Sequence, residues 1–158
     1  SLEVLKKGQL SSTQVEHFQG LSGIKAVYEE ALYCKSRHWD TFTPATVFLR
    51  QYGQEFRKYV MGMRAKRKIS ARALWEESRL ERYVKEKKPV NGFNREARIM
   101  PKEMQGRFLS KIILFDKKIV LITPATDAGA VLISSNELHA AFMAMFETIW
   151  AMSKPIKA

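Results

Sequence analysis

Lys111 and Asp116 are the residues whose types and spacing point most directly to chemistry in this chain of 158 residues. Both lie in the apolar stretch 109–126, which reads LSKIILFDKKIVLITPAT. A lysine ammonium is a strong point charge for a phosphate or a carboxylate, so the pair predicts an anion site. Two structural roles compete with this interpretation. Asp116 followed by Lys117 is typical of a tight hairpin turn, and Lys111 alternates with Ile112 in a way that also suits a solvent-facing position.

Trp75 and His38 are two further candidates for ligand binding. Trp75 stands at the end of a predicted strand, and α/β sheets bind ligands at the carboxyl ends of their strands. His38 stands near the start of another predicted strand, between Arg37 and Trp39. Core packing is the alternative role for each tryptophan. The three histidines are too scattered to predict a metal site, so we expect neither a metal nor a cofactor.

The composition indicates a basic globular domain. Its net charge is +11, with 46% hydrophobic residues, and such a surface attracts polyanions and anionic ligands. Three roles remain open for the basic run from Arg57 to Lys68. It contacts an acidic ligand, it contacts the phosphates of DNA held by another domain, or it is only exposed to water. No apolar run reaches the roughly 20 residues of a membrane span. Cys34 is the only cysteine, so no intramolecular disulfide forms; we expect a buried thiol and a reducing, cytoplasmic environment.

Hydrophobic periodicity predicts strands that alternate with helices along the first half of the chain. That alternation predicts an α/β fold with a mixed, mostly parallel sheet flanked by helices. Ser22 and Ser134 are the expected N-caps of two of the helices, and a further helix is expected to end within 2–10. The predicted strands are 13–19, 37–44, 69–75, 95–101, 108–115, 118–123 and 130–134, and the predicted helices are 24–35, 46–68, 76–88 and 137–153.

The last predicted helix has a continuous apolar face that includes Phe146, Ile149 and Trp150. Helical spacing places these three side chains on one side of the helix. The sequence leaves two roles open for that face. It packs into the core of the domain, or it forms the interface of a dimer.

The stretch 109–126 resembles the signature of the phospholipase D superfamily, HxKxxxxD followed by GSxN. Lys111 and Asp116 stand where the signature has its lysine and aspartate. Leu109 stands in the place of the histidine, and the residues TPAT at 123–126 replace GSxN. In that family the histidine attacks phosphorus, and a leucine has nothing to attack with. The resemblance therefore implies a phospholipase D-like fold that binds a molecule without cleaving it, and we expect no catalytic residue.

Three further phrases resemble the C-terminal effector domain of TrmB-like transcriptional regulators. They are GLSGIKAVYEEAL at 20–32, ARIMPKEM at 97–104 and ISSNELHAAFMAMFETIWAMSKP at 133–155. In that family a DNA-binding winged helix-turn-helix precedes a linker helix and a phospholipase D-like sensor domain. The resemblance implies that residues 1–12 end the linker helix, that the N-terminal DNA-binding domain is absent, and that residues 13–158 form the phospholipase D-like sensor and dimerisation domain.

The function implied is that of a non-catalytic ligand-sensing and dimerisation domain of a prokaryotic transcriptional regulator. Its expected partners are a small-molecule effector of unknown identity and a second copy of the chain. DNA would be contacted only through the missing N-terminal domain, and no membrane is involved. Two alternatives remain: a phosphodiesterase or nuclease of the phospholipase D type, which Lys111 and Asp116 suggest, and a basic module that binds nucleic acid itself, which the net charge suggests.

Overall fold

The computed structural model describes residues 13–44, 53–92, 94–123 and 128–157. The helix expected to end within 2–10, the first part of the helix expected over 46–68 and most of the TPAT segment lie outside these ranges. The elements are β1 (Gln14–Gln19), α2 (Gly20–Leu32), β2 (His38–Thr43), α3 (Gly53–Lys66), β3 (Ser70–Trp75), α4 (Glu77–Lys85), β4 (Arg95–Ile99), the 3-10 turn η2 (Lys102–Met104), β5 (Lys111–Phe115), β6 (Lys118–Thr123), β7 (Gly129–Ser134), α5 (Asn136–Met152) and β8 (Lys154–Pro155).

The described strands form one sheet in the order β1-β7-β6-β5-β2-β3-β4-β8. Only β2 with β3 and β3 with β4 pair in parallel. All other neighbouring strands pair antiparallel, so the expectation of a mostly parallel sheet was wrong, although the mixed α/β architecture is confirmed. The reason is the path after β1. Helix α2 leads from the edge strand β1 to β2 in the middle of the sheet, so this β-α-β unit does not join neighbours.

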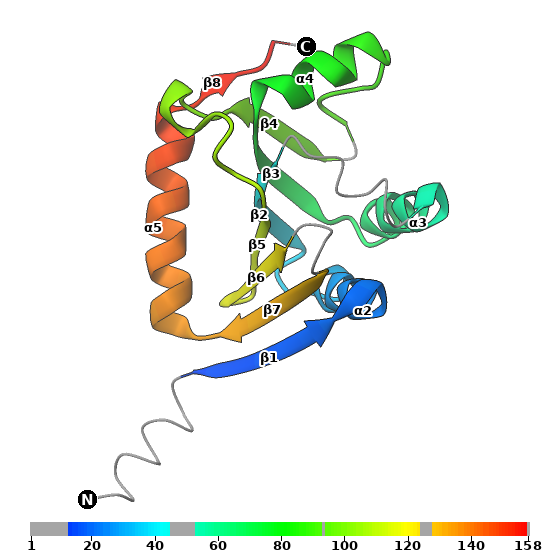
Figure 1. Cartoon of the computed structure of the whole chain (residues 1–158), viewed down its shortest axis with the longest axis vertical. Coiled ribbons are helices and arrows are strands. Elements are labelled where there is room, and N and C mark those ends of the chain that lie inside the picture. The colour runs from blue at the N-terminus through cyan, green and yellow to red at the C-terminus, as the bar shows by residue number, and fades with distance from the viewer. Residues whose placement is uncertain (1–12, 45–52, 93, 124–127, 158) are drawn as a thin grey trace, which may run out of the picture.

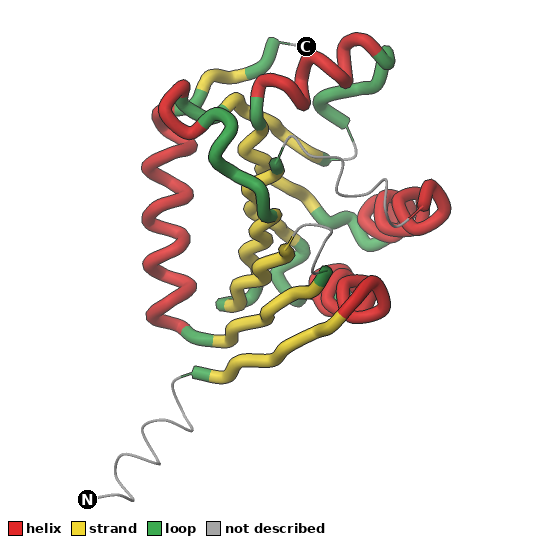
Figure 2. Tube along the Cα trace, in the orientation of Figure 1, coloured by secondary structure: helices red, strands yellow, loops and turns green. Residues whose placement is uncertain are grey.

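Helices cover both faces of the sheet (Figures 1 and 2). Helices α2, α3 and α4 lie on one face, and α5 lies on the other (Figure 1). Two core clusters match these layers: Ile24 and Val60 pack with Trp39 and Ile113 beneath α2 and α3, while Phe146 of α5 packs on the opposite side of the sheet. None of the described helices has the length and apolar character needed to cross a bilayer.

Local sequence signals explain most element boundaries. The apolar stripe of α2 is buried as its spacing predicted, and Cys34 behind it is a buried free thiol. The hairpin at Asp116 and Lys117 is confirmed, because β5 and β6 pair up to Phe115 and Lys118 and both turn residues have positive φ.

The two expected N-caps were both wrong. Helix α2 begins earlier, after Gln19, because Gly20 with φ of +66° turns the chain directly out of β1. Ser22 therefore lies inside the helix. The cap of α5 is Ser135, one residue after the expected Ser134, and its hydroxyl accepts a hydrogen bond from the backbone N–H of Leu138 at 3.2 Å.

Candidate anion-binding site

Lys111 opens β5 on the face of the sheet that α2, α3 and α4 cover. Strand β5 runs antiparallel to β2, so its first residue lies at the carboxyl end of that strand. The ammonium group is 5.5 Å from the centre of the Tyr28 ring, and the side chain lines a small cavity between the sheet and the helices. The lysine is therefore part of a pocket and does not face open solvent.

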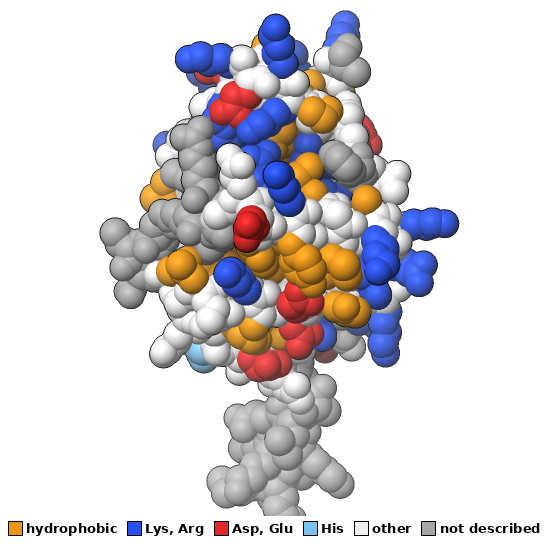
Figure 3. All heavy atoms as spheres, turned by 90° about the vertical axis from the view of Figure 1, so that its right-hand side faces the viewer, with side chains coloured by type: hydrophobic (Ala, Val, Ile, Leu, Met, Phe, Trp, Pro, Cys, Tyr) orange, Lys and Arg blue, Asp and Glu red, His pale blue; other side chains and the backbone are white. Residues whose placement is uncertain are grey.

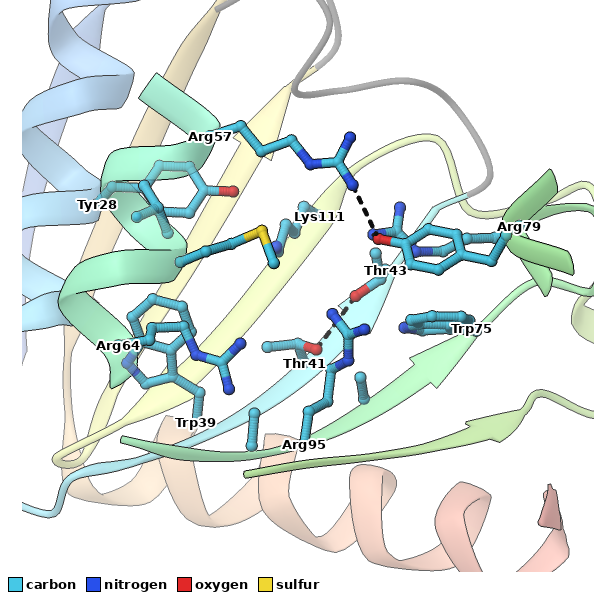
Figure 4. Close-up of a pocket in the computed structure, with 15 residues that line it drawn as sticks. Tyr28, Trp39, Thr41, Thr43, Arg57, Arg64, Trp75, Arg79, Arg95 and Lys111 are labelled. Carbon is cyan, nitrogen blue, oxygen red and sulfur yellow. Dashed lines mark hydrogen bonds between the residues drawn. The ribbon is translucent and has the colours of Figure 1, made fainter. Parts of the chain in front are cut away.

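Four arginines join this lysine around one cavity of about 60 Å³ (Figure 4). None of the described residues that line it is an aspartate or a glutamate. We call this site the basic pocket, and its cations are Arg57 and Arg64 of α3, Arg79 of α4, Arg95 of β4 and Lys111 of β5.

Helical spacing explains why α3 supplies two of these cations. Arg57, Val60, Met61 and Arg64 follow one another at i, i+3, i+4 and i+7, and all four line the pocket. Arg64 is only 6% exposed, so it occupies a position on the helix that an apolar residue would normally fill. On α4, Arg79 and Tyr83 are likewise one turn apart and face the same cavity.

Aromatic rings stand beside these cations where carboxylates would be expected. The guanidinium of Arg64 lies 5.4 Å from the Trp39 ring, and those of Arg79 and Arg95 each lie 4.9 Å from the Trp75 ring. Such cation–π contacts offset part of the cost of burial without cancelling the charge. The pocket therefore keeps a concentrated positive field.

Hydrogen bonds hold several of these cations in place, but they do not use every buried N–H donor. The Tyr83 hydroxyl accepts from Arg57 at 3.4 Å and from Arg79 at 3.2 Å, and Arg95 donates to the Val90 carbonyl at 2.9 Å. The buried Nε of Arg79 has no hydrogen-bond partner within the described part of the chain. An unsatisfied buried donor on a charged group is costly, and an anion would satisfy it.

The pKa values of the pocket residues reflect this crowding. Burial and the nearby cations Arg79, Arg64 and Arg95 lower the pKa of Lys111 to about 7. Burial and the neighbouring arginines also lower the pKa of Arg79 to about 10. Burial alone would raise the pKa of Tyr83, but Arg79, Arg95 and Arg57 outweigh it and lower that pKa. All three shifts show that the site disfavours positive charge in its empty form.

Arg72, on the opposite face of the sheet, shows how the same chain treats an ordinary buried cation. Its guanidinium bonds Asp40 at 2.8 Å and both carboxylate oxygens of Glu147 on α5. The hydrogen bonds to Glu147 raise the pKa of Arg72. The absence of carboxylates among the described lining of the basic pocket is therefore a local feature of that site.

A second, larger cavity of about 400 Å³ lies next to the basic pocket. The two cavities share Arg57, Met61, Tyr83 and Arg95, so they adjoin each other. Figure 3 views this side of the molecule and shows Lys and Arg side chains at its top, where α4 lies, and along its right-hand edge. We call this cavity the outer chamber, and its remaining lining residues are Gln54, Lys58, Lys88 and Pro89.

The structure brings together two of the three predicted ligand-binding residues. Lys111 and Trp75 line the basic pocket, whereas His38 does not. The two ring nitrogens of His38 bond the Ser70 hydroxyl at 2.7 Å and the Asp40 carboxylate at 2.9 Å, and that carboxylate belongs to the Arg72 network. Alternation along β2 explains the separation, because Trp39 faces the pocket side and its neighbour His38 faces the other.

Leu109 and Asp116, two other described positions of the phospholipase D-like signature, do not line the pocket. Leu109 precedes β5, is 58% exposed and is absent from the lining. Asp116 is at the far end of β5, where its carboxylate accepts from the backbone N–H groups of Lys35 at 2.5 Å and Ser36 at 2.8 Å. The turn role of Asp116 is therefore the one observed.

None of the three histidines of the chain lines the basic pocket. His17 lies on the edge strand β1, His38 belongs to the opposite face of the sheet, and His139 lies in the first turns of α5. The pocket thus offers no imidazole at hydrogen-bonding distance from Lys111 to attack phosphorus.

The candidate interface residues on α5 lie against the sheet. Phe146 is fully buried and Trp150 is 7% exposed, both in the core cluster that α5 forms with Phe42 and Leu74. Ile149 is partly buried against the same cluster. These side chains therefore take the core role that the sequence had left open.

Sequence reasoning missed Arg79 and Arg95, which complete the ring of cations. Arg79 stands in a highly charged helix, where charged residues normally face water, and Arg95 opens a short strand. The spacing of Arg57 and Arg64 with Val60 was a usable signal, because it places two arginines on the inward face of a helix.

Comparisons with solved structures place this architecture among known folds. The chain aligns with TrmBL2, an archaeal chromatin protein whose structure shows a novel mode of DNA binding, at TM-score 0.54 and 12% identity over 98% of this chain. It spans 61% of the length of that protein. No protein-family model matches the sequence, and no curated protein sequence matches it.

Two nucleases give alignments that cover almost their whole length. Nuc from Salmonella typhimurium, a phospholipase D family member, aligns at TM-score 0.62 and 11% identity over 92% of this chain and 99% of its own. NucT from Helicobacter pylori aligns at TM-score 0.53 and 11% identity over 91% of this chain and 99% of its own. These likenesses show that the chain has a phospholipase D-like fold.

Proposed function

We propose that this domain senses a small anionic molecule in the basic pocket and does not cleave it. The observation that carries the proposal is a set of five cations around one cavity, with no carboxylate among the described lining residues. Such a site costs stability while it is empty and recovers that cost when an anion enters. Residues with only a structural role would be expected to be apolar, or to pair with opposite charges as Arg72 does.

The two adjoining cavities suggest the chemical class of the ligand. A space of about 60 Å³ holds one compact anionic group, such as a phosphate or a carboxylate. The outer chamber of about 400 Å³ has the size at which pockets hold small organic molecules. We therefore expect a small organic phosphate or carboxylate, with its charged group beside Lys111 and its body near Met61 and Pro89.

As in the TrmB-like regulators that the sequence resembles, we propose that this sensing belongs to a transcriptional regulator. A ligand shifts a conformational equilibrium only by its different affinity for the two states. Here the difference arises because Arg57 and Arg64 on α3, Arg79 on α4 and Lys111 on the sheet repel one another when no anion is bound. An anion would draw α3 and α4 toward the sheet. We propose that this movement is transmitted to a neighbouring DNA-binding domain.

Calorimetric titration with sulfate tests the proposal, because sulfate stays a dianion across the accessible pH range. We expect binding by the wild type, a loss of at least about tenfold in affinity in Lys111→Met, and wild-type affinity in Lys85→Met, which removes an exposed lysine outside the pocket. A thermal-shift screen with sugars, nucleotides and phosphorylated metabolites then identifies the ligand. Equal sulfate affinity in the Lys111 and Lys85 variants would overturn the proposal.

A phosphodiesterase or nuclease is the second candidate function, favoured by the fold shared with Nuc and by the position of Lys111 in the pocket. Its difficulty is the lack of an imidazole beside that lysine. Turnover of bis(p-nitrophenyl) phosphate by the wild type that disappears in Lys111→Ala would establish this function and refute a purely sensing role.

A further inference from the structure

Three polar side chains on the α5 side of the sheet form a chain of hydrogen bonds around an imidazole. The Nδ1 atom of His38 lies 2.7 Å from the Oγ atom of Ser70, and its Nε2 atom lies 2.9 Å from the Oδ1 atom of Asp40. A hydroxyl, an imidazole and a carboxylate in this order are the groups that activate a serine for nucleophilic attack. None of the three lines the basic pocket, so the proposed anion sensor does not use them.

The pairing of β2 with β3 brings these side chains together. The two strands run in parallel with His38 opposite Ser70, and alternation puts Asp40, two residues after His38, on the same face of the sheet. The backbone N–H of Ser70 donates to the Arg37 carbonyl at 3.0 Å, which fixes this register where both strands begin. The arrangement depends on long-range strand pairing, and no spacing within the sequence predicts it.

Asp40 determines which nitrogen of the His38 ring carries a proton. Burial alone would raise the pKa of Asp40, but hydrogen bonds from His38 and Arg72 lower it, so this carboxylate is ionised at neutral pH. An ionised carboxylate only accepts hydrogen bonds, so a neutral His38 donates from Nε2 and keeps a lone pair on Nδ1. The Ser70 hydroxyl then donates to that lone pair, because its other acceptor, the Arg37 carbonyl, is farther away at 3.4 Å. The proton of the serine is therefore directed at a base.

Neither the orientation of the ring nor burial prevents this chemistry. In the common Ser-His-Asp arrangement Nε2 faces the serine, whereas here Nδ1 does. Either imidazole nitrogen can accept a proton while the other donates, so the roles of the three groups are unchanged. The side chain of His38 is 34% exposed and Ser70 is partly exposed, so a small molecule can reach the hydroxyl from solvent.

We propose that Ser70, His38 and Asp40 form a nucleophilic site that hydrolyses small, activated carboxylic esters. Ser70 is the nucleophile, His38 is the general base and Asp40 is a positioning residue. The backbone N–H of Ser70 already donates to Arg37, so it is not available to stabilise an oxyanion. We therefore expect a slow site that acts on esters with good leaving groups, such as aryl esters. This activity is independent of the basic pocket, which lies on the other face of the sheet.

The reaction has two steps that use the same base. In the first, the Oγ atom of Ser70 attacks the carbonyl carbon of the ester while its proton passes to Nδ1 of His38. The tetrahedral intermediate then collapses, the bond to the leaving group breaks, and the leaving phenol takes the proton from His38. In the second step, water attacks the acyl group on Ser70, His38 accepts the proton of the water and returns it to Oγ, and the carboxylic acid is released.

Labelling with diisopropyl fluorophosphate tests the nucleophile, because attack by Ser70 forms a stable O–P bond and expels fluoride. Mass spectrometry of peptides is expected to locate the adduct at Ser70, to find none in Ser70→Ala, and to show labelling slowed about 100-fold or more in His38→Gln. Ser78→Ala is the matched control, since it changes an exposed serine on α4, and it should react like the wild type. Cooperative thermal unfolding will show that each variant is folded. A wild type that forms no adduct, or an adduct that persists in Ser70→Ala, would refute the proposal.

Two further measurements use the wild type itself. Nitrogen-15 NMR of the neutral His38 ring should show a protonated Nε2 and a bare Nδ1, the tautomer that Asp40 imposes. A ring protonated on Nδ1 would overturn the proposal, because that nitrogen could not take the proton of Ser70. Hydrolysis of p-nitrophenyl acetate should be faster in the wild type than in Ser70→Ala and should pass through an acetyl group on Ser70. Equal hydrolysis by the two proteins would show that Ser70 transfers no acyl group.

Discussion

Lys111 and Arg72 are cations on opposite faces of one sheet, and their surroundings differ in kind. Arg72 has two carboxylate partners, Asp40 and Glu147, whereas Lys111 has the cations Arg79, Arg64 and Arg95 as its charged neighbours. The first arrangement is complete without any other molecule. The second has no carboxylate among the described residues that line the pocket, which is why we propose the ligand site on the Lys111 side.

Lys111→Met should therefore stabilise the empty protein. The pKa of Lys111 is about 7 in the folded state against the ordinary lysine value of 10.5, so the folded protein must bury a disfavoured charge below pH 7. This penalty is present in full below pH 7 and disappears as the pH rises from 7 to 10.5. We expect a gain of roughly 1–3 kcal/mol in the free energy of unfolding at pH 6, shrinking toward zero near pH 10.

Urea denaturation of the wild type and Lys111→Met across this pH range measures the effect. Lys85→Met serves as the control, because Lys85 is exposed and lies outside the pocket. A variant that is more stable yet no longer binds sulfate would be the signature of a binding site that trades stability for function. Loss of stability at pH 6 in Lys111→Met would contradict this account of the site.

Arg72 links two elements, because it stands on β3 and bonds Glu147 of α5. Burial would raise the pKa of Asp40, but hydrogen bonds from His38 and Arg72 hold it below its ordinary value. Arg72→Met would leave the Asp40 carboxylate, which is 4% exposed, without its main cation. We expect a loss of about 2–4 kcal/mol at neutral pH, measured by chemical denaturation.

Glu147→Gln is the matched comparison, because it removes only the partly exposed partner of Arg72. The side chain of Glu147 is 53% exposed, so its loss is expected to cost less than about 1 kcal/mol. The stabilisation from Asp40 should be lost as the pH falls through its lowered pKa in the wild type, and that acid-sensitive component should be reduced in Arg72→Met. Equal losses in the two variants would show that Asp40 does not depend on Arg72.

The hairpin between β5 and β6 is fastened to the end of α2 by one carboxylate. Asp116 accepts from the N–H groups of Lys35 and Ser36 and has φ of +46°, a conformation that aspartate and asparagine tolerate. Asp116→Ala removes both acceptors and should cost about 1–2 kcal/mol in thermal or urea unfolding. Asp116→Asn keeps one acceptor and suits the turn, so it should cost less; the reverse order would contradict this role.

Periodicity within single elements predicted the strands and helices well, but it did not predict how they pair. The stripe on α2 and the hairpin at Asp116 depend only on neighbours in the sequence, and both are confirmed. The position of β1 at the edge beside β7 depends on long-range pairing, which local patterns do not encode. The same limit applied to the pocket: Lys111 and Trp75 were identified, but the arginines that surround them come from three other elements.

At the scale of the whole molecule, the surface charge and the basic pocket are expected to bind different kinds of anion. Lys58, Lys66 and Lys68 are exposed and accessible to a long polyanion, whereas Arg64 and Arg79 are buried and accessible only to a small one. Association driven by surface charge weakens steeply with salt, because it depends on the release of counterions. Binding in a buried pocket is screened much less.

We therefore expect random-sequence duplex DNA to bind this chain weakly and without help from the pocket. Fluorescence anisotropy at about 0.05 M salt should show binding that falls by orders of magnitude at about 0.2 M. Lys111→Met should leave the DNA affinity unchanged while it weakens sulfate binding at least about tenfold, because a phosphodiester backbone has no access to the buried cations. Neutralising Lys66 and Lys68, which line neither cavity, should weaken DNA binding and leave sulfate binding unchanged. If Lys111→Met weakened DNA binding as strongly as sulfate binding, the pocket would be a nucleic-acid site, and the small-molecule proposal would fail.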